Sequence, residues 1–151
     1  FIFGGGQERN MRAGTENVYG IVGFAKALQI AERDYQKDSA YIKALKMYMI
    51  DQLKNEIPGV SFNGDVEGGL YTVLSACFKK SDKSDFILFN LDIANICISG
   101  GSACSSGTDI GSHVINALGK ASQYATIRFS FSKYNTREEI DIVVKKLKEF
   151  I

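Results

Sequence analysis

Hydrophobic residues recur at helical spacing in two stretches near the start of the chain. The first stretch predicts a helix over residues 17–34, for which Asn17 or Thr15 supplies the N-cap. The second predicts a helix over residues 39–55, which ends before Pro58 because proline cannot continue a helix. Two helices are therefore expected ahead of any sheet.

Shorter apolar and alternating runs follow and predict strands. They cover residues 60–65, 71–78, 95–99 and 126–132. In the last run, Ile127 and Phe129 alternate with Arg128 and Ser130. Because successive side chains of a strand point to opposite faces, Arg128 is expected on the face opposite the core.

Three more helices are predicted between and after these strands. One begins at Ser84 as its N-cap, and another covers residues 112–118 and ends at Gly119. The last carries the capping box of Thr136 and Glu139 ahead of an apolar stripe. Helices flanking three or four short strands predict an α+β fold, an α/β sandwich with a mostly antiparallel sheet.

Composition narrows the classes of function. With 151 residues and 45% hydrophobic content, the chain is long enough for one compact core. A net charge of +1 gives no support for nucleic-acid binding. No apolar run approaches the roughly 20 residues of a membrane span, and no signal segment opens the chain. The start at Phe1, without an initiator Met, suggests a piece of a longer protein.

The chain has three cysteines in two kinds of surroundings. Cys77 and Cys97 lie in apolar runs, which predict reduced, buried thiols and a cytoplasmic setting. Cys104 instead lies in the polar, glycine-rich stretch 99–112, where a thiolate can react. The alternative is an incidental loop cysteine.

Three motifs resemble one family. They are Ser99-Gly-Gly-Ser-Ala-Cys-Ser-Ser106, Gly4-Gly-Gly-Gln-Glu8 with Arg12-Ala-Gly-Thr15, and Thr126-Ile-Arg-Phe-Ser130 followed by Asn135-Thr136 and the final helix. In their order along the chain and in their spacing, they are similar to the cysteine desulfurases of the long-loop (NifS/IscS-like) group, which belong to the class V aminotransferases and to the fold type I pyridoxal phosphate enzymes.

The resemblance implies a reaction and a site. A lysine-bound pyridoxal phosphate would act on L-cysteine, and Cys104 would take up the sulfur as a persulfide while alanine is released. Arg128 matches the arginine that binds the substrate carboxylate. Thr15 matches a threonine that reaches the cofactor phosphate of the neighbouring subunit in a homodimer. The sulfur would pass to an acceptor protein, such as an iron–sulfur scaffold, or to thiolated tRNA and cofactors.

The resemblance also implies a domain division. Residues 1–16 would be a remnant of the large cofactor domain, 17–35 a connecting helix, and 36–151 the small C-terminal domain. The family's cofactor lysine follows a histidine, and no lysine here does, so the chain alone is expected to be inactive. Gly100 and Gly111 depart from the residues common in the family.

Other functions remain as alternatives. One is a stand-alone persulfide carrier or interaction domain that works without pyridoxal phosphate, and a narrower one is an enzyme acting on selenocysteine or cystine. His113, the only histidine, matches no catalytic position and is expected to be structural or exposed. The spacing of cysteines and histidine predicts no metal site.

Overall fold

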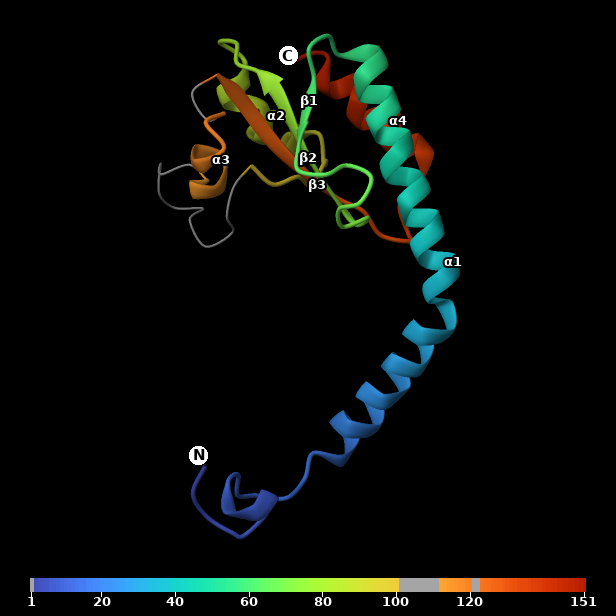
Figure 1. The fold of residues 1–151 in the computed structure, drawn as a ribbon, viewed down its shortest axis with the longest axis vertical. Coiled ribbons are helices and arrows are strands. Elements are labelled where there is room, and N and C mark those ends of the chain that lie inside the picture. The colour runs from blue at the N-terminus through green and yellow to red at the C-terminus, as the bar shows by residue number, and fades with distance from the viewer. Residues whose placement is uncertain (1, 101–111, 121–122) are drawn as a thin grey trace. The chain divides into compact units, whose positions relative to one another are not determined.

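The computed structural model describes residues 2–100, 112–120 and 123–151, with only the backbone of Asp85. Contacts divide the chain into two compact units, of which one ends at Lys37 and the other is Asp38–Ile151. Figure 1 shows their helices and strands. Every residue described as buried belongs to the second unit, which therefore contains the core.

A single long helix, α1, runs over Val18–Glu56. The predicted break between helices 17–34 and 39–55 was therefore wrong. Residues 35–38 contain neither glycine nor proline, so nothing interrupts the backbone hydrogen bonds there. Asn17, one of the two predicted caps, accepts a hydrogen bond from a backbone N–H of the first turn at 3.0 Å.

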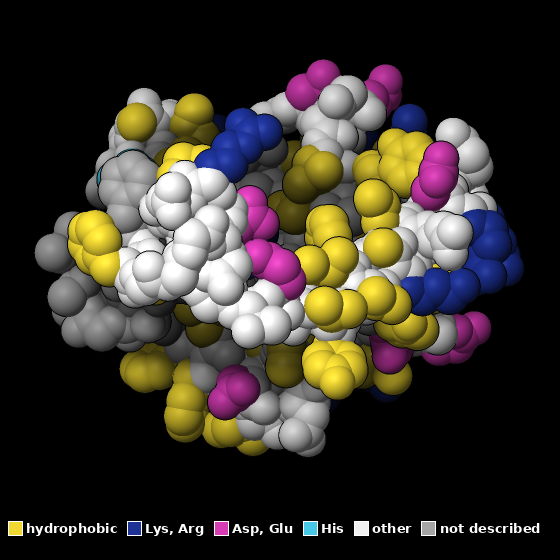
Figure 2. Space-filling view, turned by 90° about the horizontal axis from the view of Figure 1, so that it is seen from below, with side chains coloured by type: hydrophobic (Ala, Val, Ile, Leu, Met, Phe, Trp, Pro, Cys, Tyr) yellow, Lys and Arg dark blue, Asp and Glu magenta, His cyan; other side chains and the backbone are white. Residues whose placement is uncertain are grey.

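The two ends of α1 differ in exposure. The C-terminal part carries a buried stripe made of Ile42, Leu45, Met49, Ile50 and Leu53. The N-terminal part exposes large hydrophobic side chains, which are Val18, Tyr19, Ile21, Val22, Phe24 and Leu28. Figure 2, the view from below, shows hydrophobic side chains gathered along this part of the helix. An exposed apolar group of this kind is typical of an interaction surface.

Three antiparallel strands form the sheet in the order β1-β2-β3. They are β1 Ser61–Asn63, β2 Val73–Lys79 and β3 Tyr124–Ser130. One face of the sheet carries the buried side chains Leu74, Ala76, Phe78, Ile127 and Phe129. They pack in one cluster with apolar residues of α1, α2 Ile87–Ile93 and α4 Arg137–Leu147. The predicted α+β fold with an antiparallel sheet is confirmed.

The helix boundaries confirm some predictions and correct others. The capping box of Thr136 and Glu139 is formed, with each side chain hydrogen-bonded to the other residue's backbone N–H. Helix α3, His113–Ala117, ends ahead of Gly119, whose φ is +69°. Ser84 does not cap a helix. It is buried at the start of the 3-10 turn Ser84–Phe86, and its Oγ accepts a hydrogen bond from the Ser81 N–H at 2.8 Å.

The strand predicted over residues 95–99 does not form. Only Ser99 is paired, in an isolated antiparallel bridge with Arg128 at the edge of the sheet. Asn95 has a φ of +58°, which takes the chain out of extended geometry directly before this segment. None of the helices within the described ranges is long and apolar enough to cross a membrane.

Candidate functional site

A row of polar residues crosses the face of the sheet that lies opposite the core. The register pairs Asn63 with Ser75 and Ser75 with Arg128, and the edge bridge pairs Arg128 with Ser99. Residues directly opposite one another on antiparallel strands point to the same face. A hydrogen bond of 3.1 Å from Asn63 Nδ2 to Ser75 Oγ follows this geometry. Four residues distant in sequence are thus brought into one line.

Arg128 lies near the end of β3 with its side chain on the exposed face. Its neighbours Ile127 and Phe129 are buried, with 2% and 5% of their surface exposed, so the predicted alternation is confirmed. Within the described part of the chain, no carboxylate forms an ion pair with the Arg128 guanidinium. The N–H donors of its planar guanidinium are therefore not paired with a described carboxylate, and their geometry suits a carboxylate ligand.

The same arginine holds the start of the stretch that contains Cys104. The Arg128 N–H donates to the Ser99 carbonyl at 2.7 Å, and the Ser99 N–H donates to the Arg128 carbonyl at 3.1 Å. Cys104 itself lies outside the described residues. It follows Ser99 by five positions, and a fully extended segment of that length spans at most about 18 Å. The covalent chain thus limits how far its sulfur can lie from Arg128.

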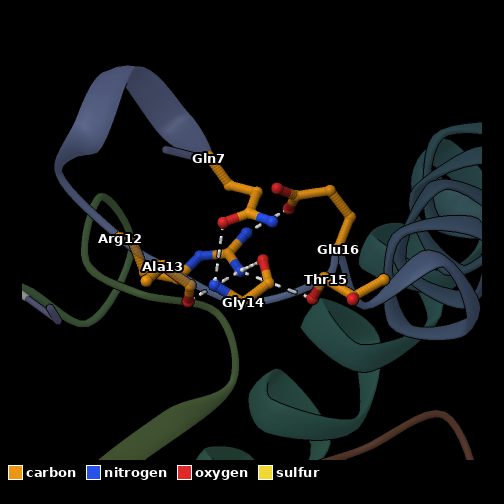
Figure 3. Close-up of polar contacts among 6 residues, drawn as sticks. All are labelled: Gln7, Arg12, Ala13, Gly14, Thr15 and Glu16. Carbon is orange, nitrogen blue, oxygen red and sulfur yellow. Dashed lines mark hydrogen bonds and ion pairs between the residues drawn. The ribbon is translucent and has the colours of Figure 1, made fainter. Parts of the chain in front are cut away.

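Thr15 belongs to the other unit, on a loop that is organised by Arg12 (Figure 3). The Arg12 guanidinium donates to the Gly14 carbonyl at 2.7 Å and more weakly to the carbonyls of Ala13 and Thr15, each at 3.4 Å. It also forms an ion pair with Glu16. One side chain therefore gathers three successive carbonyl groups of the loop.

The opposite side of this loop is held by a glutamine. Gln7 Oε1 accepts a hydrogen bond from the Gly14 N–H at 3.1 Å, and Gly14 has a φ of +100°, which favours glycine. Thr15 is exposed, and its hydroxyl has no hydrogen-bond partner among the described residues. Because Arg12 occupies the carbonyl oxygens, the loop presents Thr15 with few acceptors that would repel an anion.

The two described cysteines differ from each other. Cys77 is completely buried, as predicted, and its Sγ lies 3.6 Å from Thr126 Oγ1. Cys97 is exposed, so the prediction of a buried thiol was wrong. The turn at Asn95 replaces the expected strand. The segment after it lines an open, mainly apolar groove of about 420 Å³, with Ile96 and Ile98 packed against the core while Cys97 stays exposed.

Among its described lining residues, the groove beside Cys97 has only one other ionisable side chain, that of Glu139. It lies between residues 94–98, the end of β3 and α4. Two of its polar side chains, Asn135 and Glu139, are bonded to each other at 3.0 Å. Glu139 also accepts from the Thr136 N–H at the start of α4, and Asn135 Oδ1 accepts from the Ser132 N–H in the preceding loop. His113 is exposed at the start of α3, as expected. No group of three or more metal-binding side chains occurs in the described ranges.

Sequence reasoning missed two parts of these sites. In the sequence, Arg12 and Gln7 stand out only as matches to a motif, and Asn63 and Ser75 carry no signal of a functional role. A glycine-rich segment that also holds an arginine and an acid four positions apart was an available signal for Arg12. The Asn63–Ser75 pairing depends on strand register, which a sequence pattern does not determine.

Comparison with known proteins gives consistent matches over nearly the whole chain. The family model described as Aminotransferase class-V matches residues 5–143. "Cysteine desulfurase IscS" of Pseudoalteromonas translucida is 36% identical over 99% of this chain and 37% of its own length. "Putative cysteine desulfurase IscS 1" of Bacillus subtilis is 36% identical over 99% of this chain and 40% of its own length.

Solved structures agree. A structure described as "NIFS-LIKE PROTEIN" has a TM-score of 0.73 and 32% identity, and it is matched over 98% of this chain and 37% of that one. A NifS-like protein from Rickettsia africae ESF-5 has a TM-score of 0.76 and 29% identity over 99% of this chain and 39% of its own. The chain thus spans 37–40% of the length of these relatives.

Proposed function

This chain belongs to the class V aminotransferase family, and on that premise we propose that it forms the C-terminal part of a cysteine desulfurase. The proposed reaction converts L-cysteine to L-alanine and leaves the sulfur on Cys104 as a persulfide. The observation that carries the proposal is the pairing of Arg128 with Ser99, because it joins a carboxylate-binding group to the start of the Cys104 stretch.

Arg128 is proposed to bind the α-carboxylate of the substrate. A guanidinium forms two parallel hydrogen bonds with a carboxylate, which fixes both the position and the orientation of an amino acid. The absence of a described carboxylate partner for Arg128 supports this role. The five-residue separation of Cys104 from Ser99 is compatible with its sulfur reaching a substrate held in this way.

Cys104 is proposed to attack as the thiolate. Its sulfur forms a bond to the substrate sulfur while the substrate C–S bond breaks, and the electron pair of that bond stays with carbon, which is protonated to give alanine. Pyridoxal phosphate, when bound, supplies the electron sink for this step. The new persulfide sulfur would then pass to an acceptor protein such as an iron–sulfur scaffold, or toward thiolated tRNA and cofactors.

Thr15 is proposed to donate its hydroxyl to the phosphate of the cofactor in the neighbouring subunit of a homodimer. The loop fits this role, since Arg12 occupies the carbonyls of residues 13–15 while the Thr15 hydroxyl is left without a described partner. A hydroxyl donor beside carbonyl groups that Arg12 already binds suits a phosphate. The chain contributes no lysine that follows a histidine, so residues 1–151 alone are proposed to be inactive.

The domain division proposed here assigns residues 1–16 to a large cofactor domain, 17–35 to a connecting helix and 36–151 to a small domain. The exposed hydrophobic residues at the N-terminal end of α1 support a contact with further protein at this helix. The packed sheet of the second unit supports a separate small domain.

The test compares cysteines in a full-length protein that carries this chain. After reaction with L-cysteine, mass spectrometry of the alkylated protein is expected to find the persulfide on Cys104. Cys104→Ser is expected to lower sulfide release by about 10³-fold or more, because the nucleophile is lost. Cys97→Ser is the matched control, since Cys97 is exposed but not placed in the site. A persulfide on Cys97, or full activity of Cys104→Ser, would contradict the proposal.

A further inference from the structure

Gln7 joins the two ends of the glycine-rich loop that carries Thr15. Its Oε1 accepts a hydrogen bond from the Gly14 N–H at 3.1 Å, across seven positions of the sequence. This contact fixes the orientation of the amide, because a backbone N–H can only donate and the exchanged amide would bring two donors together. Gly14 directly precedes Thr15, so the bond holds the backbone next to the residue that is proposed to bind the cofactor phosphate.

The chain between Gln7 and Gly14 adopts a conformation that needs support from its surroundings. Glu8, Arg9 and Asn10 have φ values of +47°, +56° and +64°, which are unfavourable for residues other than glycine. Such conformations persist only where neighbouring contacts hold them, and they are concentrated at functional sites. Here the Gln7 carbonyl accepts from the Asn10 N–H at 3.1 Å. Gln7 therefore closes this turn with its backbone and reaches Gly14 with its side chain.

Gly5 leaves the space that the end of the Gln7 side chain occupies. A Cβ atom at residue 5 would lie 2.6 Å from Gln7 Oε1, which is closer than two such atoms can approach. A side chain at this position would therefore displace the oxygen from the Gly14 N–H. The absence of a side chain at Gly5 is thus matched to this one hydrogen bond.

Gln7 and Arg12 bind different groups of the same short segment. Arg12 binds the carbonyls of residues 13–15, whereas Gln7 binds the N–H of Gly14. The backbone beside Thr15 is thus held by both side chains, while the Thr15 hydroxyl has no hydrogen-bond partner among the described residues. A donor that is held in place in advance loses less conformational freedom when it binds a ligand.

We propose that Gln7 is a positioning residue for phosphate binding, which fixes Gly14 so that the Thr15 hydroxyl can donate to the phosphate. The inference rests on the proposed function, because it needs the cofactor phosphate at Thr15. The ligand group is the phosphate monoester of pyridoxal phosphate. Gln7 acts on this group through Gly14 and Thr15 and does not touch it.

The test titrates a cofactor-free, full-length protein that carries this chain with pyridoxal phosphate and with pyridoxal, which lacks the phosphate. Gln7→Met keeps a side chain of similar length but replaces the amide by a poor acceptor. It is expected to weaken pyridoxal phosphate binding about fivefold, the effect of one lost hydrogen bond, and to leave pyridoxal binding within about twofold. Equal weakening of both ligands, or unchanged binding of pyridoxal phosphate, would overturn the inference.

Two further variants separate positioning from a general loss of folding. Gly5→Ala keeps Gln7 but displaces its Oε1, so it is expected to produce the same loss for pyridoxal phosphate alone. Gln29→Met is the matched control, because Gln29 is an exposed glutamine on α1 whose Oε1 accepts only from the Lys26 side chain among the described residues, at 3.4 Å. It is expected to leave both affinities unchanged.

A double variant tests whether Gln7 acts through Thr15. Thr15→Val removes the hydroxyl and is expected to weaken pyridoxal phosphate binding about tenfold, because a hydrogen bond to a charged group is lost. Adding Gln7→Met to Thr15→Val is expected to weaken binding by no more than about a further twofold, since the group that Gln7 positions is already absent. If the two losses multiply in full, the inference is wrong and the proposed phosphate contact stands. If Thr15→Val leaves the affinity unchanged, the proposed contact itself is wrong.

Discussion

Two arginines in this chain are used in opposite ways. In the first unit, Arg12 donates to the carbonyls of three successive residues and pairs with Glu16. In the sheet unit, the backbone N–H and the backbone carbonyl of Arg128 are both hydrogen-bonded to Ser99. The Arg128 guanidinium has no ion-pair partner among the residues that the structure describes. The backbone of Arg128 is fixed and its charge is left available.

The difference separates an arginine that organises a loop from one that we propose to bind a ligand. A guanidinium has five N–H donors and no acceptor, so its partners must be oxygen atoms. Where the backbone supplies these oxygens, as around Arg12, the side chain shapes a loop. Where the described residues supply no carboxylate, as around Arg128, we expect the charged acceptor to come from a bound ligand.

The largest predicted effect follows from removing the available charge. Arg128→Ala in a full-length protein is expected to lower kcat/KM for L-cysteine about a hundredfold, because the proposed charged partner of the substrate carboxylate is lost. The free energy of unfolding is expected to change by less than about 0.5 kcal/mol, since the side chain is exposed. Steady-state kinetics and denaturant unfolding measure the two quantities.

The control for this prediction keeps the charge but changes its shape. Arg128→Lys is expected to recover only part of the lost kcat/KM, because an ammonium group cannot form the paired hydrogen bonds of a guanidinium. If Arg128→Ala strongly lowered the free energy of unfolding, Arg128 would have a structural role like that of Arg12, and the contrast between the two arginines would be wrong.

A smaller effect is predicted at the organising arginine. Arg12→Ala is expected to weaken pyridoxal phosphate binding about tenfold, because the carbonyls of residues 13–15 lose their donor and Thr15 loses its fixed position. Titration of the cofactor-free protein, followed by fluorescence, measures this affinity. The KM for L-cysteine at saturating cofactor is expected to stay within about twofold.

Arg33→Ala is the matched control for Arg12→Ala. Arg33 is exposed on α1, and its described hydrogen bonds go to the side chain of the adjacent Asp34 and not to backbone carbonyls. It is expected to leave cofactor affinity unchanged. If Arg12→Ala raised KM for L-cysteine while cofactor affinity stayed the same, Arg12 would have a role in substrate binding, as proposed for Arg128, and not in organising the Thr15 loop.

The sequence predicted the parts of this contrast that depend on local pattern. The period-2 alternation around Arg128 was sufficient to place its side chain on the exposed face, and the capping box at Thr136 was sufficient to start α4. These features depend on neighbours within four positions, so a linear pattern contains them.

The features that were not predicted depend on residues distant in sequence or on backbone conformation. The bridge between Ser99 and Arg128 and the contact of Asn63 with Ser75 are set by register, which is a property of the assembled sheet. Cys97 was expected to be buried because its neighbours are apolar. The left-handed turn at Asn95 exposes it instead.

The smallest predicted effect concerns an acidic counterpart of Arg12. Asp65 gathers backbone N–H groups of one turn, as Arg12 gathers carbonyls, and Oδ1 accepts from Gly68 at 2.9 Å and from Glu67 at 3.0 Å. These two bonds, the first more strongly, lower the pKa of Asp65 below its ordinary value of 3.8. The folded state therefore binds the proton less readily than the unfolded state does. The resulting stability is present above the ordinary pKa and is lost as the pH falls below it.

Asp65→Asn tests this comparison, because the amide oxygen can still accept both hydrogen bonds but does not titrate in this range. Thermal unfolding at about pH 6 and about pH 3 is expected to show a smaller loss of stability for Asp65→Asn than for the unchanged protein. Glu67→Gln is the control, since it removes a carboxylate from the same turn and keeps the Asp65 bonds. An equal loss in Asp65→Asn and in the unchanged protein would show that charge at Asp65 does not organise its turn, and that Arg12 has no acidic counterpart here.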